Sequence, residues 1–250
     1  MISKSKTKLI NSLSQKKFRD ETGLFVAEGT KLVTDLVSVF QCSILVATAD
    51  WLREHRQFRA TETIEATDEE LKKISNQKSP QGVLAVFEKP DYMWTEQELS
   101  QKLSLALDDV QDPGNLGTII RIADWFGISD IFCSEHSADA FNPKTVQASM
   151  GALARVRVHV VNLESFLKTC QSKMPIYGTF MNGENIYSKT LTPTGIIVMG
   201  NEGNGISSEI ERLVSERLLI PNFPAGQATS ESLNVGVATA LVCGEFRRRL

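Results

Sequence analysis

The stretch IIVMGNEGNGI, residues 196–206, decides the fold class. Its first four residues, Ile196–Met199, are apolar and have the length of a buried strand, and a loop with glycines at 200, 203 and 205 follows directly. The glycine spacing does not match the dinucleotide fingerprint G-x-G-x-x-G. Because ligands of open α/β sheets bind beyond the carboxyl ends of the strands, this loop is a candidate ligand site. Glu202 within it is either a solvated loop acid or a group that meets a cationic ligand.

The same strand-then-helix pattern continues on both sides of this stretch. Apolar runs alternate with helix-like segments, which predicts an α/β fold with a mostly parallel sheet and helices on both faces. The expected strands are 103–107, 130–133, 157–161, 175–180, 196–199 and 218–220, and the expected helices are 118–126, 143–153, 163–170, 208–215 and 232–248. Gly127 is expected to close the first of these helices, Asn142-Pro143 to open the second, and Ser208 with Glu211 to cap the fourth.

A smaller α/β unit is expected before this region. Residues 31–40 predict a helix, 43–47 and 83–87 predict strands, and Thr67–Glu70 is a capping-box helix start. Lys89-Pro90-Asp91 breaks the last strand, and a second capping box at 95–98 opens a short polar helix. We therefore expect two domains, residues 1–95 and 103–250.

Composition excludes several classes of protein. The chain has 250 residues, 42% of them apolar, so it can bury a substantial core without metal or disulfides. Its apolar runs are too short to cross a bilayer and its N-terminus lacks a signal-peptide core, so we expect a cytoplasmic protein with no membrane partner. Four separated cysteines, without histidines at ligand spacing, predict reduced thiols and no metal site.

Charge is unevenly distributed along the chain. The totals are 27 Lys+Arg against 30 Asp+Glu, a net charge of -3, which disfavours coating of nucleic acid by bulk charge. However, a basic leader, residues 1–19, holds six basic residues and no acid, and Arg247–Arg249 end the chain. Solvated termini and RNA contacts explain this pattern equally well.

Two further loops stand out. Residues 109–118 contain two glycines and lead into a helix that carries Arg121, whose N-terminus can meet an anion; a plain turn is the alternative. Residues 220–234 lead into an apolar helix, 235–246, which packs either on the sheet or across a homodimer. The three histidines, His55, His136 and His159, lie in segments without a G-x-S-x-G elbow, which disfavours hydrolase chemistry.

Together the three loops resemble the motifs of the SpoU (TrmH-like) family of RNA ribose 2′-O-methyltransferases in the SPOUT superfamily. The motifs are Asp112–Thr118 with Arg121, Ile197–Ile206, and Ile220-Pro221 followed by Glu231–Ala238. Residues 25–29 and 79–83 also resemble the small ribosomal-protein-like substrate-binding domain that precedes this catalytic domain in many members. The resemblance implies a C-terminal trefoil-knot methyltransferase domain and a homodimer.

The resemblance also implies site residues, with S-adenosylmethionine as cofactor and no metal. The implied catalytic residues are Asn115, Arg121, Glu202, Ser232 and Asn234, and the implied cofactor-binding residues are Thr179, Gly200, Ile220 and Leu233. The family proposal makes Arg121 activate the hydroxyl, but a guanidinium stays protonated in nearly every protein environment. Our hypothesis is that Arg121 orients the adjoining RNA phosphate and stabilises the developing alkoxide.

The expected activity is therefore methyl transfer to a ribose 2′-hydroxyl of structured RNA, with ribosomal RNA favoured over transfer RNA on family analogy. One alternative is an RNA-binding or ribosome-associated protein that keeps the fold without the chemistry. Another is a Rossmann-type small-molecule methyltransferase, which predicts a glycine-rich loop after the first strand and a monomer. We expect RNA to be held by Lys4–Arg19, Arg121 and the Arg247–Arg249 tail, so deletion of residues 1–19 should weaken RNA binding and spare cofactor affinity.

Overall fold

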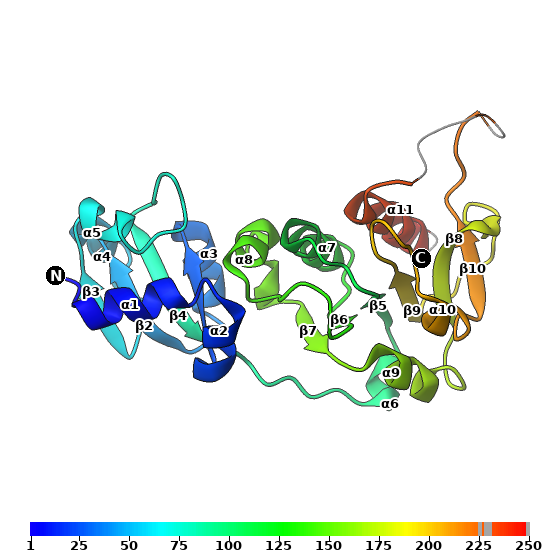
Figure 1. Cartoon of the computed structure of the whole chain (residues 1–250), viewed down its shortest axis with the longest axis horizontal. Coiled ribbons are helices and arrows are strands. Elements are labelled where there is room, and N and C mark those ends of the chain that lie inside the picture. The colour runs from blue at the N-terminus through cyan, green and yellow to red at the C-terminus, as the bar shows by residue number, and fades with distance from the viewer. Residues whose placement is uncertain (225–226, 228–231, 249–250) are drawn as a thin grey trace. The chain divides into compact units, whose positions relative to one another are not determined.

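The computed structural model describes residues 1–224, 227 and 232–248, and this part of the chain forms two compact units (Figure 1). The first unit contains Met1–Asp91 and Asp139–Ala154, and the second contains Tyr92–Ala138 and Arg155–Leu250. The segment Asp139–Ala154 therefore packs with the N-terminal residues, although it lies within the range expected for the second domain. The domain boundaries at 1–95 and 103–250 stay a prediction.

The first unit is built on a four-stranded mixed sheet with the strand order β1-β4-β2-β3. Only β2 and β3 pair in parallel. The strands are β1 (Leu24–Glu28), β2 (Cys42–Ala47), β3 (Glu62–Glu65) and β4 (Val83–Glu88). The helices are α1 (Lys4–Ser12), α2 (Lys16–Thr22), α3 (Thr30–Leu36), α4 (Ala49–Glu54), α5 (Asp68–Lys72), α8 (Pro143–Ser149) and the 3-10 helix η1 (Ala152–Ala154).

The basic leader is part of this unit's core. Ile10 of α1 and Leu13 at its C-terminal end are buried, and the side chain of Arg19 on α2 is 1% exposed. A guanidinium nitrogen of Arg19 lies 2.7 Å from a carboxylate oxygen of Asp139, and another donates to the Leu13 carbonyl oxygen at 2.8 Å. The expectation that Arg19 contacts RNA is therefore wrong, because this buried side chain has its partners within the protein. The deletion of residues 1–19 is also an unsuitable test, because it would remove core residues along with the charges.

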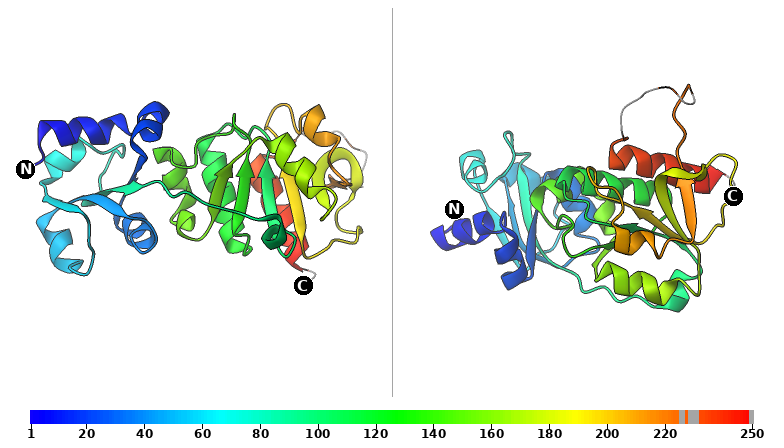
Figure 2. Two further views of the ribbon diagram at one scale, coloured as in Figure 1. Left: turned by 90° about the horizontal axis from the view of Figure 1, so that it is seen from below. Right: turned by 45° about the vertical axis from the view of Figure 1, so that its right-hand side comes forward.

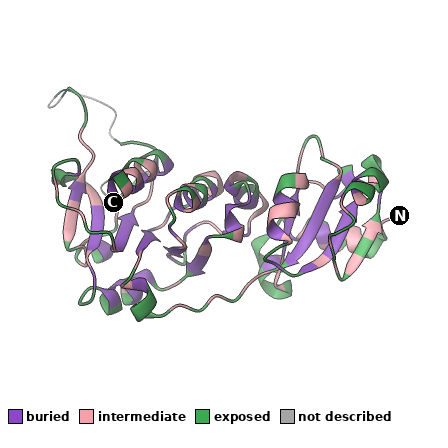
Figure 3. Ribbon diagram, turned by 180° about the vertical axis from the view of Figure 1, so that it is seen from behind, coloured by how far each residue is buried: buried purple, intermediate pink, exposed green. Residues whose placement is uncertain are grey.

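The second unit is built on a six-stranded sheet with the order β10-β8-β9-β5-β6-β7, in which every pairing is parallel. The strands are β5 (Leu103–Leu107), β6 (Asp130–Cys133), β7 (Arg157–Val160), β8 (Ile176–Asn185), β9 (Gly195–Met199) and β10 (Glu216–Leu219). The central strands are buried, as Figure 3 shows. When both faces of a parallel sheet are covered, the side chains on both sides of each strand are buried. This explains why the strands of the second unit are near-continuous apolar runs in the sequence.

Helices cover both faces of this sheet (Figures 1 and 2). On one face, α6 (Glu96–Leu99), α9 (Leu163–Cys170) and α10 (Ser208–Glu211) pack into a core that includes Phe132 and Val198. On the other face, α7 (Pro113–Trp125) and α11 (Val235–Arg248) lie against each other. The predicted fold class is confirmed, and no described helix has the length and hydropathy needed to cross a membrane.

Two local predictions in this unit were wrong. Helix α7 begins at Pro113 and not near 118, because the Asp112 side chain caps the first turn by accepting from the Asn115 backbone N–H at 2.8 Å. Asn115 therefore lies on a helix and not in a loop. Helix α10 has Ser207 as its N-cap, without a side-chain hydrogen bond, so the predicted cap at Ser208 is incorrect. By contrast, α9 matches the predicted range 163–170.

Candidate functional site

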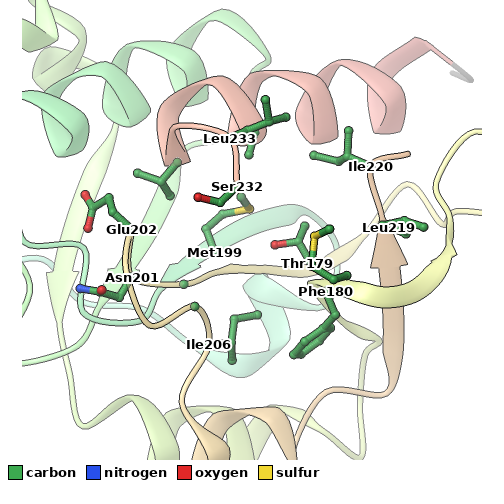
Figure 4. Close-up of a pocket in the computed structure, with 15 residues that line it drawn as sticks. Thr179, Phe180, Met199, Asn201, Glu202, Ile206, Leu219, Ile220, Ser232 and Leu233 are labelled. Carbon is green, nitrogen blue, oxygen red and sulfur yellow. The ribbon is translucent and has the colours of Figure 1, made fainter. Parts of the chain in front are cut away.

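A cavity opens where β8 separates from β9. These strands pair only over Ile176–Gly178, and the register between β8 and β10 shifts just beyond, so Thr179–Met181 leave the regular sheet. The space enclosed is about 210 Å³, several times the volume of one water molecule. It lies beyond the carboxyl ends of β9 and β10 and below the start of α11 (Figure 4). Its walls include Thr179, Phe180, Met181, Met199, Gly200, Asn201, Glu202, Gly205, Ile206, Leu219, Ile220, Ser232, Leu233, Val235 and Ala238.

The loop after β9 is closed upon itself by the backbone and by one side chain. The Asn201 and Gly205 backbones exchange two hydrogen bonds, of 2.9 and 3.0 Å. The Asn201 Oδ1 accepts from the backbone N–H groups of Gly203 and Asn204, at 2.9 and 3.0 Å. Its Nδ2 donates to the Asp109 carbonyl oxygen at 2.7 Å, which ties the loop to the end of β5. Asn201 thus fixes the loop that carries Glu202.

Residue 200 must be a glycine because the two ends of this loop approach each other closely. A Cβ atom at residue 200 would lie 2.2 Å from the Gly205 carbonyl carbon and 2.3 Å from the Ile206 nitrogen. Both neighbours are backbone atoms, so they could not move aside without opening the loop. The glycine therefore allows the turn that brings Glu202 to the cavity wall.

Asn115 joins three segments at the rim of the cavity. Its Nδ2 donates to Glu202 Oε1 at 2.8 Å, and its Oδ1 accepts from Asn234 Nδ2 at 3.0 Å. Asn234 in turn caps α11, because its Oδ1 accepts from the backbone N–H groups of Gly236 and Val237 at 3.0 and 3.3 Å. The first turn of α7, the loop after β9 and the start of α11 are held together by this chain of amides.

The end of β5 supports the same region. Asp108 is buried, and its carboxylate accepts from the Ser207 backbone N–H at 2.7 Å, just after the loop. Asp109 has a positive φ of 56° and its carboxylate accepts from the Ser134 hydroxyl at 2.6 Å. These contacts connect β5, β6 and the loop after β9, so the site is anchored to the centre of the sheet.

Comparison with known proteins identifies the family. A match to the SpoU rRNA Methylase family covers residues 102–244, which is more than half of the chain. The chain belongs to this family. Residues 4–85 match the MRM3-like substrate binding domain.

Individual SpoU relatives extend the similarity over the whole chain. The 23S rRNA (guanosine(2553)-2′-O)-methyltransferase RlmP of Bacillus subtilis is 29% identical over 245 residues, covering 97% of this chain and 96% of the relative. A solved TrmH-family protein from Porphyromonas gingivalis superposes with a TM-score of 0.89 and 40% identity, covering 100% of each chain. An AdoMet-bound rRNA methyltransferase from Sinorhizobium meliloti superposes with a TM-score of 0.87 and 30% identity, covering 100% of this chain and 97% of that one.

The structure brings most of the residues implied by the SpoU resemblance to one place. Thr179, Gly200, Ile220 and Leu233 all line the cavity, together with Glu202 and Ser232. Asn115 and Asn234 reach Glu202 through hydrogen bonds. Glu231 of the third motif lies outside the described residues.

Arg121 is the exception among the candidates. It is exposed on α7, does not line the cavity and makes no hydrogen bond or ion pair with another described residue. It lies six residues after Asn115 on the same helix, which corresponds to roughly 9 Å along the axis. The structure therefore leaves the guanidinium exposed on α7 and outside the cavity lining.

Met199, Asn201 and Ile206 belong to the second motif but were not predicted as site residues, although all three line the cavity. Asn201 has a sequence signal, since an Asn beside a glycine-rich turn commonly caps its own loop backbone. Met199 and Ile206 have no signal beyond their place in that motif, because their position at the cavity depends on the separation of β8 from β9.

The residues that line the cavity fit S-adenosylmethionine, the cofactor of the SpoU family. The apolar walls suit an adenine ring, whereas Thr179, Ser232 and Glu202 place a few polar groups where a ribose or amino group can bond. A carboxylate beside the cavity also suits the positive charge of a sulfonium. Among the described residues, no group of three His, Cys, Asp or Glu side chains could hold a metal ion.

Proposed function

We propose that this protein transfers the methyl group of S-adenosylmethionine to a ribose 2′-hydroxyl of ribosomal RNA. The observation that carries this proposal is the cavity at residues 179, 200, 220 and 233, joined at its rim to the Glu202–Asn115–Asn234 chain. The rRNA 2′-O-methyltransferase named among the relatives matches this chain over nearly its full length, which supports ribosomal RNA as the substrate.

The cofactor supplies an electrophilic methyl group, so the protein's own task is positioning. Holding the 2′-oxygen in line with that methyl group can supply roughly 7–11 kcal/mol of the barrier reduction. The amides of Asn115 and Asn234 fix Glu202, and the capped loop of Asn201 fixes the cavity wall, so little reorganisation is needed when the substrates bind. Arg121 would orient the adjoining phosphate and stabilise negative charge on the attacking oxygen.

An RNA-binding protein without activity is the weaker alternative. Contact with RNA would not by itself require a cavity with apolar walls beyond the strand ends, nor a carboxylate held at its rim by two amides. Binding of S-adenosylmethionine, measured by calorimetry, separates the two possibilities, because the binding-only protein has no use for the cofactor.

A homodimer is part of this proposal. On α11, Val237 and Leu241 are four residues apart on one helix face and remain 51% and 41% exposed. Apolar side chains at this spacing are suited to a second copy of the chain. We also propose that the methyltransferase domain has the family's trefoil knot, that residues 1–95 bind the RNA substrate, and that the protein acts in the cytoplasm, where it meets its ribosomal RNA.

The experiment that tests the activity is a map of alkali-resistant linkages in RNA from cells with and without the gene. A methylated 2′-oxygen cannot attack its own phosphodiester, so one linkage in ribosomal RNA should become alkali-sensitive when the gene is deleted. Complementation with the wild-type gene should restore resistance. Identical maps in ribosomal and transfer RNA would contradict the proposal.

A further inference from the structure

The first unit has a hollow lined by lysines from two distant parts of the sequence. Its volume is about 360 Å³, and its lining residues come from α1, α5 and the residues that flank them. Figure 1 shows both helices near the N-terminus. Lys4 and Lys8 are one helical turn apart on α1, and Lys73 caps the end of α5. The lining is completed by Ile2, Thr7 and Glu70.

The two helices that form this hollow are fixed to each other. The Asn11 side chain donates to the Lys73 carbonyl oxygen at 3.2 Å, and the Ile2 backbone N–H donates to Glu70 Oε1 at 3.2 Å. Ile10 of α1 and Leu71 of α5 belong to the same buried core. The spacing of the three lysines is therefore set by the fold.

The ammonium groups of these lysines are available to bind an anion. Within the described part of the chain, Lys4, Lys8 and Lys73 form no ion pair and all three are exposed. Lys6, on another side of α1, is by contrast paired with Glu62 of β3. Glu70 is the one acid in the hollow, and its two oxygens already accept from the backbone N–H groups of Ile2 and Thr67. The hollow therefore carries a net positive charge.

We infer that this lysine hollow, Lys4, Lys8 and Lys73, binds backbone phosphates of the RNA substrate. The inference rests on the proposed function for the identity of the polyanion. Phosphate contacts from lysine fix the position of an RNA without reading its sequence, and the hollow offers no aromatic side chain on which a base could stack.

The surroundings restrict the direction in which RNA can leave the hollow. A neighbouring hollow that shares Glu70 is lined by four further acids, Asp50, Glu65, Asp68 and Glu69. Repulsion between these carboxylates and phosphates excludes the RNA backbone from that side. The backbone is then confined to the α1 side of the lysine hollow, which gives the unit a preferred orientation on its RNA.

The test is the salt dependence of RNA binding by the full-length protein. The probe is deproteinised 23S rRNA, and the variant is Lys4→Ala/Lys8→Ala/Lys73→Ala. Loss of three phosphate contacts should weaken binding at least about tenfold near 0.1 M salt and make the log–log salt slope shallower by about 2 to 3. The affinity for S-adenosylmethionine should not change, because that cavity is formed by other residues.

Two further variants distinguish the effect of the lysine hollow on RNA binding from the effect of the protein's net charge. Lys168→Ala/Lys173→Ala/Arg212→Ala removes the same net charge from exposed positions of the second unit, outside residues 1–95 and away from the cavity lining, and should leave the salt slope within error of wild type. Lys4→Arg/Lys8→Arg/Lys73→Arg keeps the charges and should retain the slope. An unchanged slope in the Lys4, Lys8 and Lys73 alanine variant, or an equal loss in the control, would overturn the inference. Failure of the methyltransferase assignment is detected separately, by the absence of cofactor binding or RNA methylation in the wild-type protein.

Discussion

The side chain of Asn115 donates to Glu202 Oε1 at 2.8 Å and at the same time accepts from Asn234 at 3.0 Å. A neutral amide can do both because it carries a donor and an acceptor, whereas a carboxylate or an ammonium could make only one of the two bonds. Since the partners lie 87 and 119 residues away, this one side chain holds together the SpoU motifs that form the cavity rim.

Replacement of Asn115 by Ala should lower the rate of methyl transfer by about ten- to a hundredfold. A hydrogen bond to a charged group contributes roughly 1.5–3 kcal/mol, and both partners of Asn115 would lose their contact. Single-turnover transfer to 23S rRNA measures the effect. Thermal unfolding should change little, because Asn115 is only partly buried.

A double-mutant cycle shows whether Asn115 acts through Glu202. Asn115→Ala and Glu202→Gln should be non-additive by at least about 0.5 kcal/mol, because the first removes the hydrogen bond to residue 202 and the second removes the negative charge that strengthens it. Thr118→Ala is the matched control, because Thr118 is exposed on the same helix and, among the residues that the structure describes, its hydroxyl bonds only to the Gly114 carbonyl oxygen within α7. Additive effects of Asn115→Ala and Glu202→Gln would show that the pair does not act as a unit.

Asn201→Ala should weaken S-adenosylmethionine binding by about ten- to a hundredfold. The substitution leaves the Gly203 and Asn204 N–H groups without their acceptor and frees the loop from Asp109. Calorimetric titration with the cofactor measures the loss. Asn204→Ala is the control within the same loop, because Asn204 contributes its backbone and not its side chain to these bonds, and it should bind the cofactor as wild type does.

Arg121→Lys should lose most of the methyl transfer activity while keeping cofactor affinity. Lysine retains the charge but not the planar fork that binds a phosphate through two parallel hydrogen bonds. Because Arg121 is exposed and does not line the cavity, neither folding nor calorimetric binding of S-adenosylmethionine should change. Turnover near that of wild type would contradict the role given to Arg121.

The sequence predicted the parallel sheet and most of its strand positions, because buried strands are apolar runs between turn residues. Assigning Pro113–Asn115 to a loop failed because Pro-Gly-Asn favours turns locally, whereas the Asp112 cap and burial of Leu116 and Ile119 stabilise a helix. The resemblance supplied the cavity residues, but nothing in the sequence showed that Arg19 would be buried against Asp139. Pairings between residues so far apart depend on the completed fold.

Val237→Asp/Leu241→Asp should convert the proposed homodimer into a monomer. Two carboxylates on the exposed face of α11 would be desolvated in any interface formed there, at a cost that a moderate interface cannot offset. Sedimentation equilibrium of the wild type and the variant measures the mass directly. Val39→Asp, an exposed apolar position in the first unit, should keep the wild-type mass. A monomeric wild type would remove the homodimer from the proposal.

A buried carboxylate outside the site should govern acid stability. Asp130 at the start of β6 is fully buried, and its oxygens lie 2.7–3.0 Å from nitrogens of Lys102, Arg157 and His159. Burial alone would raise the pKa of Asp130, but these three hydrogen-bonding partners outweigh it and hold the pKa well below its usual range.

The stability that Asp130 contributes should therefore be present at neutral pH and be lost in acid. Since its pKa is lower in the folded protein than in the unfolded chain, the contribution is complete above about pH 5 and declines as the pH falls through about 4 and below. Asp130→Asn should lower the free energy of unfolding by roughly 3 kcal/mol at pH 7, because it leaves the partly buried cations of Lys102 and Arg157 without their counter-ion. The difference in unfolding free energy between this variant and the wild type should become smaller below about pH 4. Urea unfolding between about pH 3 and 8 measures this difference. Asp124→Asn is the control, because it removes a partly exposed pair with Arg155, and it should lower the free energy of unfolding by less than about 1 kcal/mol throughout. If the difference in unfolding free energy between the wild type and Asp130→Asn does not depend on pH, the packing of the Asp130 side chain and not its charge explains its role.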